Sequence, residues 1–213
     1  MKLILIVVFI SWLTACGTNR EIAPIDSKTG MLQSSGTIAD ARVLISKKIP
    51  LAKFKGMIVV ASADLDSDEI NKVDEVKQVK AINYFDDVYS VADLQKLVIA
   101  NNLQDKVMTL STMEGLRDLY RSYRPFLFLH FKCIKSEEKY YRLIATNPDT
   151  MEDVFVSEVK IKNYSKTAYN LAAFLTLGAG MHDYDYYNNC DVSDPEVRFS
   201  IFNSLIVWIN HNK

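Results

Sequence analysis

The segment 181–191 gathers side chains that could do chemistry, and it lies between two expected helices. Its ligand and acid/base groups are His182, Asp183, Asp185 and Asp191. The Asp183-x-Asp185 pair lacks the sharp-turn glycine and distal glutamate of a calcium loop, and the segment has a single histidine, so we expect no metal site. Two of Asp183, Asp185 and Asp191 could instead serve as the acid/base pair of a glycan or peptidoglycan hydrolase.

The same segment carries three tyrosines, Tyr184, Tyr186 and Tyr187. Tyrosine supplies large amphipathic contact area at protein interfaces and at sugar sites. These three side chains are therefore a candidate partner-binding surface. The alternative is that they only pack over the end of the domain, and the sequence leaves both interpretations open.

His130 stands beside Lys132 in an expected strand, where it could act as a general base. No nucleophile with a fixed partner accompanies it, so we expect a histidine whose hydrogen bonds are satisfied within the fold. The chain also lacks a Gly-x-Ser-x-Gly elbow, a His-Glu-x-x-His pair, a phosphate-cradling glycine loop and a Cys-x-x-Cys motif. The sequence therefore favours a binding role over catalysis and predicts no cofactor.

Residues 1–15 have the pattern of a secretory signal. Met1 and Lys2 make a short positive start, ten of the eleven residues from Leu3 to Leu13 are apolar, and small residues follow. As a helix, the apolar stretch would span only about 17 Å against roughly 30 Å of hydrocarbon, so it is too short for a stable membrane anchor. It is a targeting segment.

Leu13-Thr14-Ala15-Cys16 resembles the lipobox of bacterial lipoproteins. The resemblance implies cleavage before Cys16 and its modification with diacylglycerol and palmitate, and acyl chains contribute about 0.8 kcal/mol per buried CH₂ to membrane anchoring. In lipoproteins retained in the inner membrane, aspartate follows the acylated cysteine. This chain has Gly17 there and so resembles the lipoproteins sorted to the outer membrane, which implies a domain facing the periplasm. The alternative is an ordinary secretory signal with a fortuitous cysteine.

The two other cysteines, Cys133 and Cys190, form an even pair once Cys16 carries lipid. In an oxidising compartment they could form a disulfide. It would close a loop of about 57 residues and contribute roughly 4 kcal/mol in the chain-entropy model. The alternative is that Cys133 is a buried core thiol unrelated to Cys190, and spacing alone does not decide.

Composition bounds the class of protein. The chain has 213 residues, of which 49% are hydrophobic and 24% charged, as in a globular protein. Its 25 basic and 26 acidic side chains give no reason to expect a nucleic-acid partner. The region 16–37 is polar with scattered Gly, Pro and Ser, which predicts a lipid-anchored flexible tether, and 38–213 is expected to form one domain.

The first half of that domain should alternate strands and helices. Strands are expected at 43–45, 57–61 and 106–110, and an exposed helix or loop at 64–74. A helix should start at Ser90, and a capping box from Ser111 to Glu114 should start a second one that ends before Pro125.

The second half should begin with three antiparallel strands at 126–134, 140–146 and 154–161, and continue with two helices. The first helix is expected at 166–177, and the second opens at Ser193-Asp194-Pro195-Glu196. The second helix should bury one face, made of Val197, Ile201, Leu205 and Trp208 or Ile209. These patterns predict a mixed α/β sandwich, with helices packed on a mixed sheet that ends in an antiparallel meander.

The element order over 90–162, with its strand–Asn147-Pro148-Asp149-Thr150–strand turn, resembles small periplasmic α/β domains of envelope lipoproteins. Examples are the curli-secretion lipoprotein family and the N-terminal domain of the Tol-system propeller protein. We therefore expect an outer-membrane-anchored lipoprotein with a non-enzymatic binding or assembly role, whose partners are the lipid bilayer and another envelope protein. The alternative function is the envelope glycan hydrolase described above.

Overall fold

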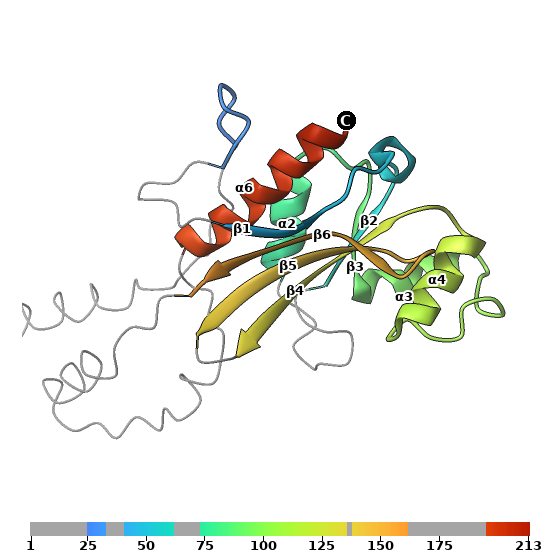
Figure 1. Cartoon of the computed structure of the whole chain (residues 1–213). Helices are drawn as coiled ribbons and strands as arrows, with labels where there is room; N and C mark the ends of the chain where they lie inside the picture. The colour runs from blue at the N-terminus through green and yellow to red at the C-terminus, as the bar shows by residue number, and fades with distance from the viewer. Residues whose placement is uncertain (1–24, 33–40, 62–72, 136–137, 162–194) are drawn as a thin grey trace, which may run out of the picture.

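The computed structural model describes residues 25–32, 41–61, 73–135, 138–161 and 195–213. They form one α/β domain built on a six-stranded mixed sheet with the order β1-β6-β5-β4-β2-β3. Figure 1 shows the sheet as a twisted layer with helices above and below it. The expected fold class, a single-domain mixed α/β sandwich, is confirmed.

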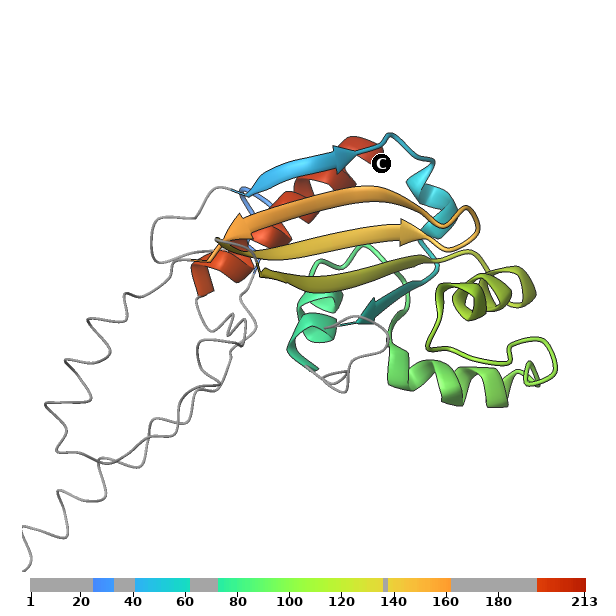
Figure 2. The same cartoon turned by 60° about the horizontal axis from the view of Figure 1, so that its bottom comes forward.

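The antiparallel part of the sheet comprises β4 (Leu127–Lys135), β5 (Lys139–Asn147), β6 (Glu152–Lys160) and the edge strand β1 (Arg42–Ser46). The parallel part comprises β2 (Ile58–Ala61) and β3 (Val88–Ser90), with β2 paired to β4 and to β3. Figure 2 shows β4, β5 and β6 side by side as the long meander that the sequence predicts.

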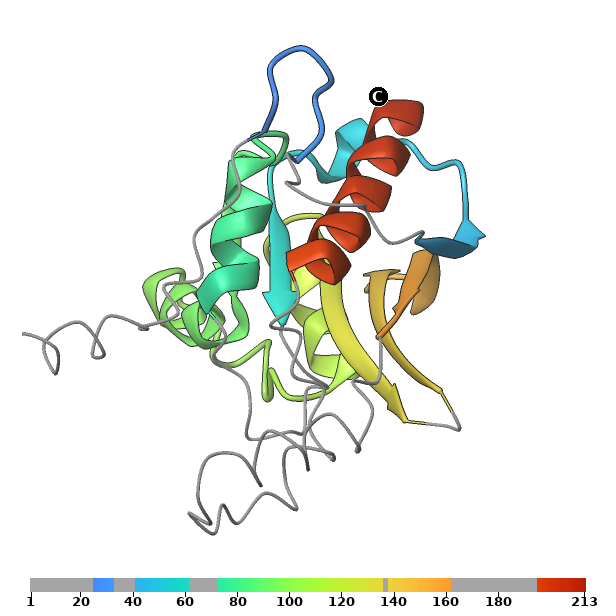
Figure 3. The same cartoon turned by 90° about the vertical axis from the view of Figure 1, so that its left-hand side faces the viewer.

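One face of the sheet is covered by α2 (Val73–Ala81) and α6 (Pro195–Asn212), and we call it the α6 face. Figure 3 shows these two helices beside each other. Aromatic side chains pack α6 against the sheet. Phe155 stacks on Trp208 with 5.2 Å between ring centroids, and the ring centroids of Phe131 and Phe202 lie 5.5 Å apart. The predicted buried face of this last helix is confirmed, including Val197, Ile201 and Leu205.

The opposite face is covered differently along its width. The chain leaves β2 for β3 through α2, and returns from β3 to β4 through α3 (Val91–Ala100) and α4 (Met113–Ser122). Because both crossovers should be right-handed and run in opposite directions along the sheet, α3 and α4 lie on the face opposite α2. Over the meander the same face carries a row of charged side chains in register across four strands: Lys132, Arg142, Glu158 and Arg42. We call it the arginine row.

Several predicted elements need correction. The expected strand 106–110 is wrong, because these residues form a loop against α3 rather than pairing with another strand. Helix α4 is capped by Thr112, whose hydroxyl accepts from the Gly115 N–H at 3.2 Å, one residue later than the predicted Ser111 cap. The sequence also missed α2 beyond residue 74, the short strand β3 and a 3₁₀ turn, η1 (Leu51–Phe54).

Part of the predicted tether is folded. Residues 25–32 form a turn in which the Asp26 N–H donates to the Met31 carbonyl oxygen at 2.8 Å, and Leu32 is only 2% exposed. Residues 25–32, which the sequence assigns to the tether, thus pack against the domain. Across the described ranges, none of the helices combines the length and the apolar character that crossing a membrane requires.

Candidate functional site

Most of the residues singled out from the sequence lie outside the described part of the chain. They are Cys16, the acid/base candidates Asp183, Asp185 and Asp191, the tyrosines Tyr184, Tyr186 and Tyr187, and Cys190. Their lipidation, binding and catalytic roles stay predictions. The helix expected at 166–177 also lies outside.

Two of the predicted residues lie on β4. Cys133 is half-buried and disulfide-bonded, and both other cysteines of the chain fall outside the described ranges, so its pairing with Cys190 stays a prediction. His130 is half-buried and stacks on Phe128, with 5.2 Å between ring centroids and 14° between ring planes. Within the described ranges, no group of three or more His, Cys, Asp or Glu is placed to hold a metal ion.

Helix α3 is fixed by local interactions that the sequence predicts correctly. The Ser90 hydroxyl accepts from the Asp93 N–H at 3.2 Å, and the Asp93 carboxylate accepts from the Ser90 N–H at 3.2 Å, which completes a capping box. The hydrogen bond from Ser90 also lowers the pKa of Asp93. On the inner side, α3 buries Leu94, Leu97 and Val98. Helix α3 is therefore held both at its first turn and along its buried side.

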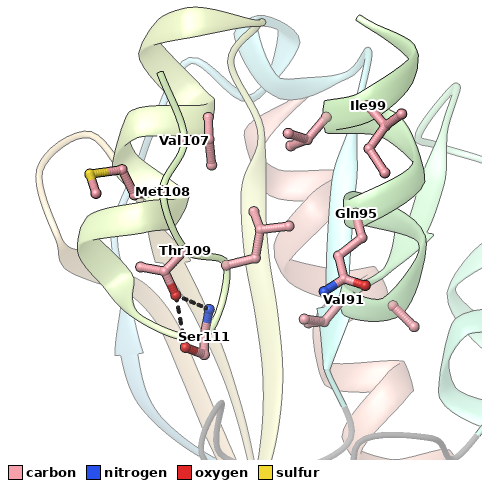
Figure 4. A pocket seen from close by; sticks show the side chains of 10 residues that line it. Val91, Gln95, Ile99, Val107, Met108, Thr109 and Ser111 are labelled. Carbon is pink, nitrogen blue, oxygen red and sulfur yellow. Dashed lines mark hydrogen bonds between the residues drawn. The ribbon is translucent and has the colours of Figure 1, made fainter. Parts of the chain in front are cut away.

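A groove of about 700 Å³ runs between α3 and the loop 107–111. Figure 4 shows Val91, Gln95 and Ile99 along one wall and Val107, Thr109 and Ser111 along the other, with Met108 directed away from α3 at the rim. Ile99 is 62% exposed and Met108 is 92% exposed. The lining contains no charged residue.

The loop wall of this groove is held by a close backbone approach. The Thr109 hydroxyl lies 2.9 Å from the Ser111 hydroxyl and accepts from the Ser111 N–H at 3.3 Å. At Gly115, in the first turn of α4, an added Cβ would come within 1.8 Å of the Thr109 carbonyl oxygen. Glycine is therefore required at this position so that the loop can pass over the start of α4.

A second hollow, of about 440 Å³, lies on the other side of α3. Its lining mixes aromatic, charged and amide side chains, among them Tyr89, Tyr123, Lys80, Lys96 and Asn101. Burial raises the pKa of Tyr89, so its hydroxyl stays protonated and able to donate. Helix α3 thus separates an uncharged apolar groove from a polar hollow.

The arginine row is the main electrostatic feature of the meander. Glu158 is 1% exposed, and its two carboxylate oxygens each accept from one arginine: from the Arg142 Nε at 3.0 Å and from the Arg42 Nε at 3.0 Å. Burial raises the pKa of Glu158, but the hydrogen bonds from Arg142 and Arg42 outweigh it, so the pKa lies below its ordinary value. Glu158 is therefore ionised at neutral pH and serves as the shared counterion of both arginines.

The groove was not predicted, because one of its walls lies in the segment 106–110, which was expected to be a strand. The apolar and β-branched residues of 106–110 are typical of extended backbone, but a loop lying against a helix can have the same composition. The signal that could have corrected the assignment is Gly115. A glycine three residues into a helix lowers helix propensity and suggests a close approach by another segment.

No protein-family model matches the chain, and no curated protein matches it either. Two solved structures are similar to part of it, the C-terminal domain of LpoB from Salmonella enterica and that from Escherichia coli. The identities are 11% and 9%, and both have a TM-score of 0.34, covering 52% of this chain and 85% of the other.

Proposed function

We propose that this chain is an outer-membrane lipoprotein with a non-enzymatic binding role in the bacterial envelope, anchored through Cys16 and facing the periplasm. The Leu13-Thr14-Ala15-Cys16 motif supports the lipid anchor and the location in the envelope. The observation that carries the binding role is the uncharged groove beside α3, with Ile99 62% exposed on its wall. Exposed apolar surface of this kind is typical of protein interaction sites.

The occupant that fits the groove is an apolar peptide segment of another envelope protein. A lining without charge offers nothing to pair with a charged ligand, and an unpaired charge would be desolvated at a cost. Met108 at the rim is unbranched and adaptable, so it can follow the surface of such a segment. The tyrosines Tyr184, Tyr186 and Tyr187 remain a second proposed contact with the same partner. Beyond the lipid on Cys16 we propose no cofactor.

Substituting Cys16 tests the proposed lipid anchor. Cys16→Ser should abolish incorporation of radiolabelled palmitate and leave the precursor uncleaved or the protein soluble after cell fractionation. The matched control is Ser11→Cys, which adds a thiol inside the apolar stretch and should not restore labelling when combined with Cys16→Ser. Normal cleavage and membrane retention of Cys16→Ser would contradict the lipoprotein assignment.

Site-specific crosslinking tests the groove. A photoreactive amino acid at Gln95, which is exposed and lines the groove, should give a discrete protein adduct in intact cells, whereas one at Gln104, which is exposed outside the lining, should not. Ile99→Asp should lower the adduct yield about tenfold, because placing a carboxylate in an apolar contact costs roughly 1–3 kcal/mol. Gln104→Asp is the control. Equal adducts from both positions would exclude the groove as the binding site.

The same assay tests the tyrosines separately. A variant with Tyr184, Tyr186 and Tyr187 all changed to Ala should weaken the adduct formed from Gln95 if the segment touches the same partner. An unchanged adduct would remove this segment from the interface and leave the groove in place.

A further inference from the structure

We infer that the turn 25–32 fixes where the lipid anchor meets the domain, so that the domain presents the α3 groove away from the anchoring membrane. The inference rests on the proposed lipidation of Cys16 and specifies how that anchor orients the binding site. It follows from three observations: how the turn is attached, how short the chain before it is, and where the groove lies.

The turn 25–32 is attached to α6 by a reciprocal contact. The Leu32 N–H donates to the Asn203 Oδ1 at 2.7 Å, and the Asn203 Nδ2 donates back to the Leu32 carbonyl oxygen at 3.4 Å. Leu32 is 2% exposed and belongs to the main apolar core, and Ile25 and Met31 pack against that core. A buried leucine with both backbone groups bonded is a firm attachment. The chain that links the lipid on Cys16 to the domain therefore ends at Ile25.

The chain between the anchor and this attachment is short. Nine peptide units separate Cys16 from Ile25, and at about 3.3–3.6 Å per residue they span no more than about 32 Å. A domain of roughly 175 residues has a radius of gyration near 16 Å, which corresponds to a globule about 40 Å across. The path around half of such a globule is about 60 Å, nearly twice the reach of the anchor.

The groove lies at the far end of the domain from the attachment. Figures 1 and 2 both place the turn 25–32 beside α6, where Leu32 bonds to Asn203 midway along the helix, and place α3 and α4 toward the other end of the sheet. An anchor of at most about 32 Å therefore cannot let the groove reach the bilayer surface. The apolar segment that fits the groove must approach from the aqueous compartment, carried by a protein domain that stands clear of the anchoring membrane.

Energy transfer to labelled lipids tests this orientation in the full lipidated chain. The mature protein, reconstituted in vesicles with acceptor-labelled headgroups, carries a donor dye through an unnatural amino acid either at Lys28 or at Met108. Both positions are exposed. Transfer should be several-fold more efficient from Lys28 than from Met108. Equal transfer, or stronger transfer from Met108, would overturn the inference.

Two variants show whether the short anchor is the cause. Leu32→Ala should release the turn, so that the next described residue is Ala41, 25 residues after Cys16 and at most about 85 Å from it along an extended chain; energy transfer from Met108 should therefore rise. A Gly/Ser insertion of about twenty residues between Pro24 and Ile25 leaves Leu32 in place and should have the same effect without loss of core packing. An unchanged Met108 signal in the insertion variant would also overturn the inference. Failure of the proposed lipidation would look different, because no variant would then bind vesicles.

Discussion

The two faces of the sheet are covered by different means, and the difference separates what stabilises the domain from what it offers to a partner. On the α6 face, one long helix packs through aromatic and aliphatic side chains, among them Phe131, Phe155 and Trp208. On the opposite face, α3 and α4 are short; each buries a few apolar side chains and also carries an N-cap hydrogen bond, and the meander carries charges. Stability should therefore be concentrated on the α6 face and recognition on the other.

The largest loss of stability should come from a substitution that removes packing on the α6 face. Trp208 is 2% exposed, stacks on Phe155 and donates from Nε1 to the Lys47 carbonyl oxygen at 3.1 Å. Trp208→Ala should lower the free energy of unfolding by about 3–5 kcal/mol, since it leaves a cavity and an unpaired carbonyl group. Urea denaturation measures the loss. A loss under about 1 kcal/mol would contradict the assignment of stability to this face.

The next largest loss of stability should come from a substitution in the arginine row. Glu158→Gln removes the charge that two arginines share, and we expect a loss of about 2–3 kcal/mol at pH 7, smaller than for Trp208→Ala because Arg42 is largely exposed. Since the folded pKa of Glu158 lies below the ordinary 4.5, its contribution is present above pH 4.5 and is lost as the pH falls through the folded pKa.

The pH dependence separates this contribution from simple packing. Denaturation of the wild type and of Glu158→Gln at pH 7 and at pH 3 should show a difference that shrinks at the lower pH. Trp208→Ala should lose the same free energy at both. A difference for Glu158→Gln that does not change with pH would mean that its carboxylate contributes by shape alone.

The faces also differ in how far the sequence predicted them. The periodicity of β4, β5 and β6 and the apolar stripe of α6 are local patterns with a large buried area behind them, and they were predicted correctly. Leu32 was missed because a single leucine in a polar stretch has no period, and its place depends on the distant Asn203 and on the core that it joins. The 106–110 loop was misassigned because strand propensity describes a backbone shape, whereas a strand also needs a partner with free hydrogen-bonding groups.

A smaller effect, localised to the groove, is expected at Gly115. Alanine would favour the helix by about 1 kcal/mol, but its Cβ would meet the Thr109 carbonyl oxygen, and such overpacking costs about 1–3 kcal/mol. Gly115→Ala should therefore displace the loop 107–111 and reduce crosslinking from Gln95 while only slightly changing stability. Gly56→Ala is the matched control, because the nearest atom to its Cβ would be the Arg124 Nη1 at 3.8 Å. Unchanged crosslinking would show that the loop is not held by this contact.

The smallest loss of stability is expected at the N-cap of α4. It tests the corrected start of this helix and whether the cap's hydrogen bond stabilises it. Thr112→Ala should cost about 1 kcal/mol because the Gly115 N–H loses its acceptor. Ser111→Ala should cost less, since the Ser111 hydroxyl contacts only the neighbouring Thr109 side chain in an exposed turn. Hydrogen exchange of the first-turn amides of α4 distinguishes the two, since only Thr112→Ala should speed it. If Ser111→Ala had the larger effect, the helix would begin one residue earlier in solution, and the loop wall of the groove would shift with it.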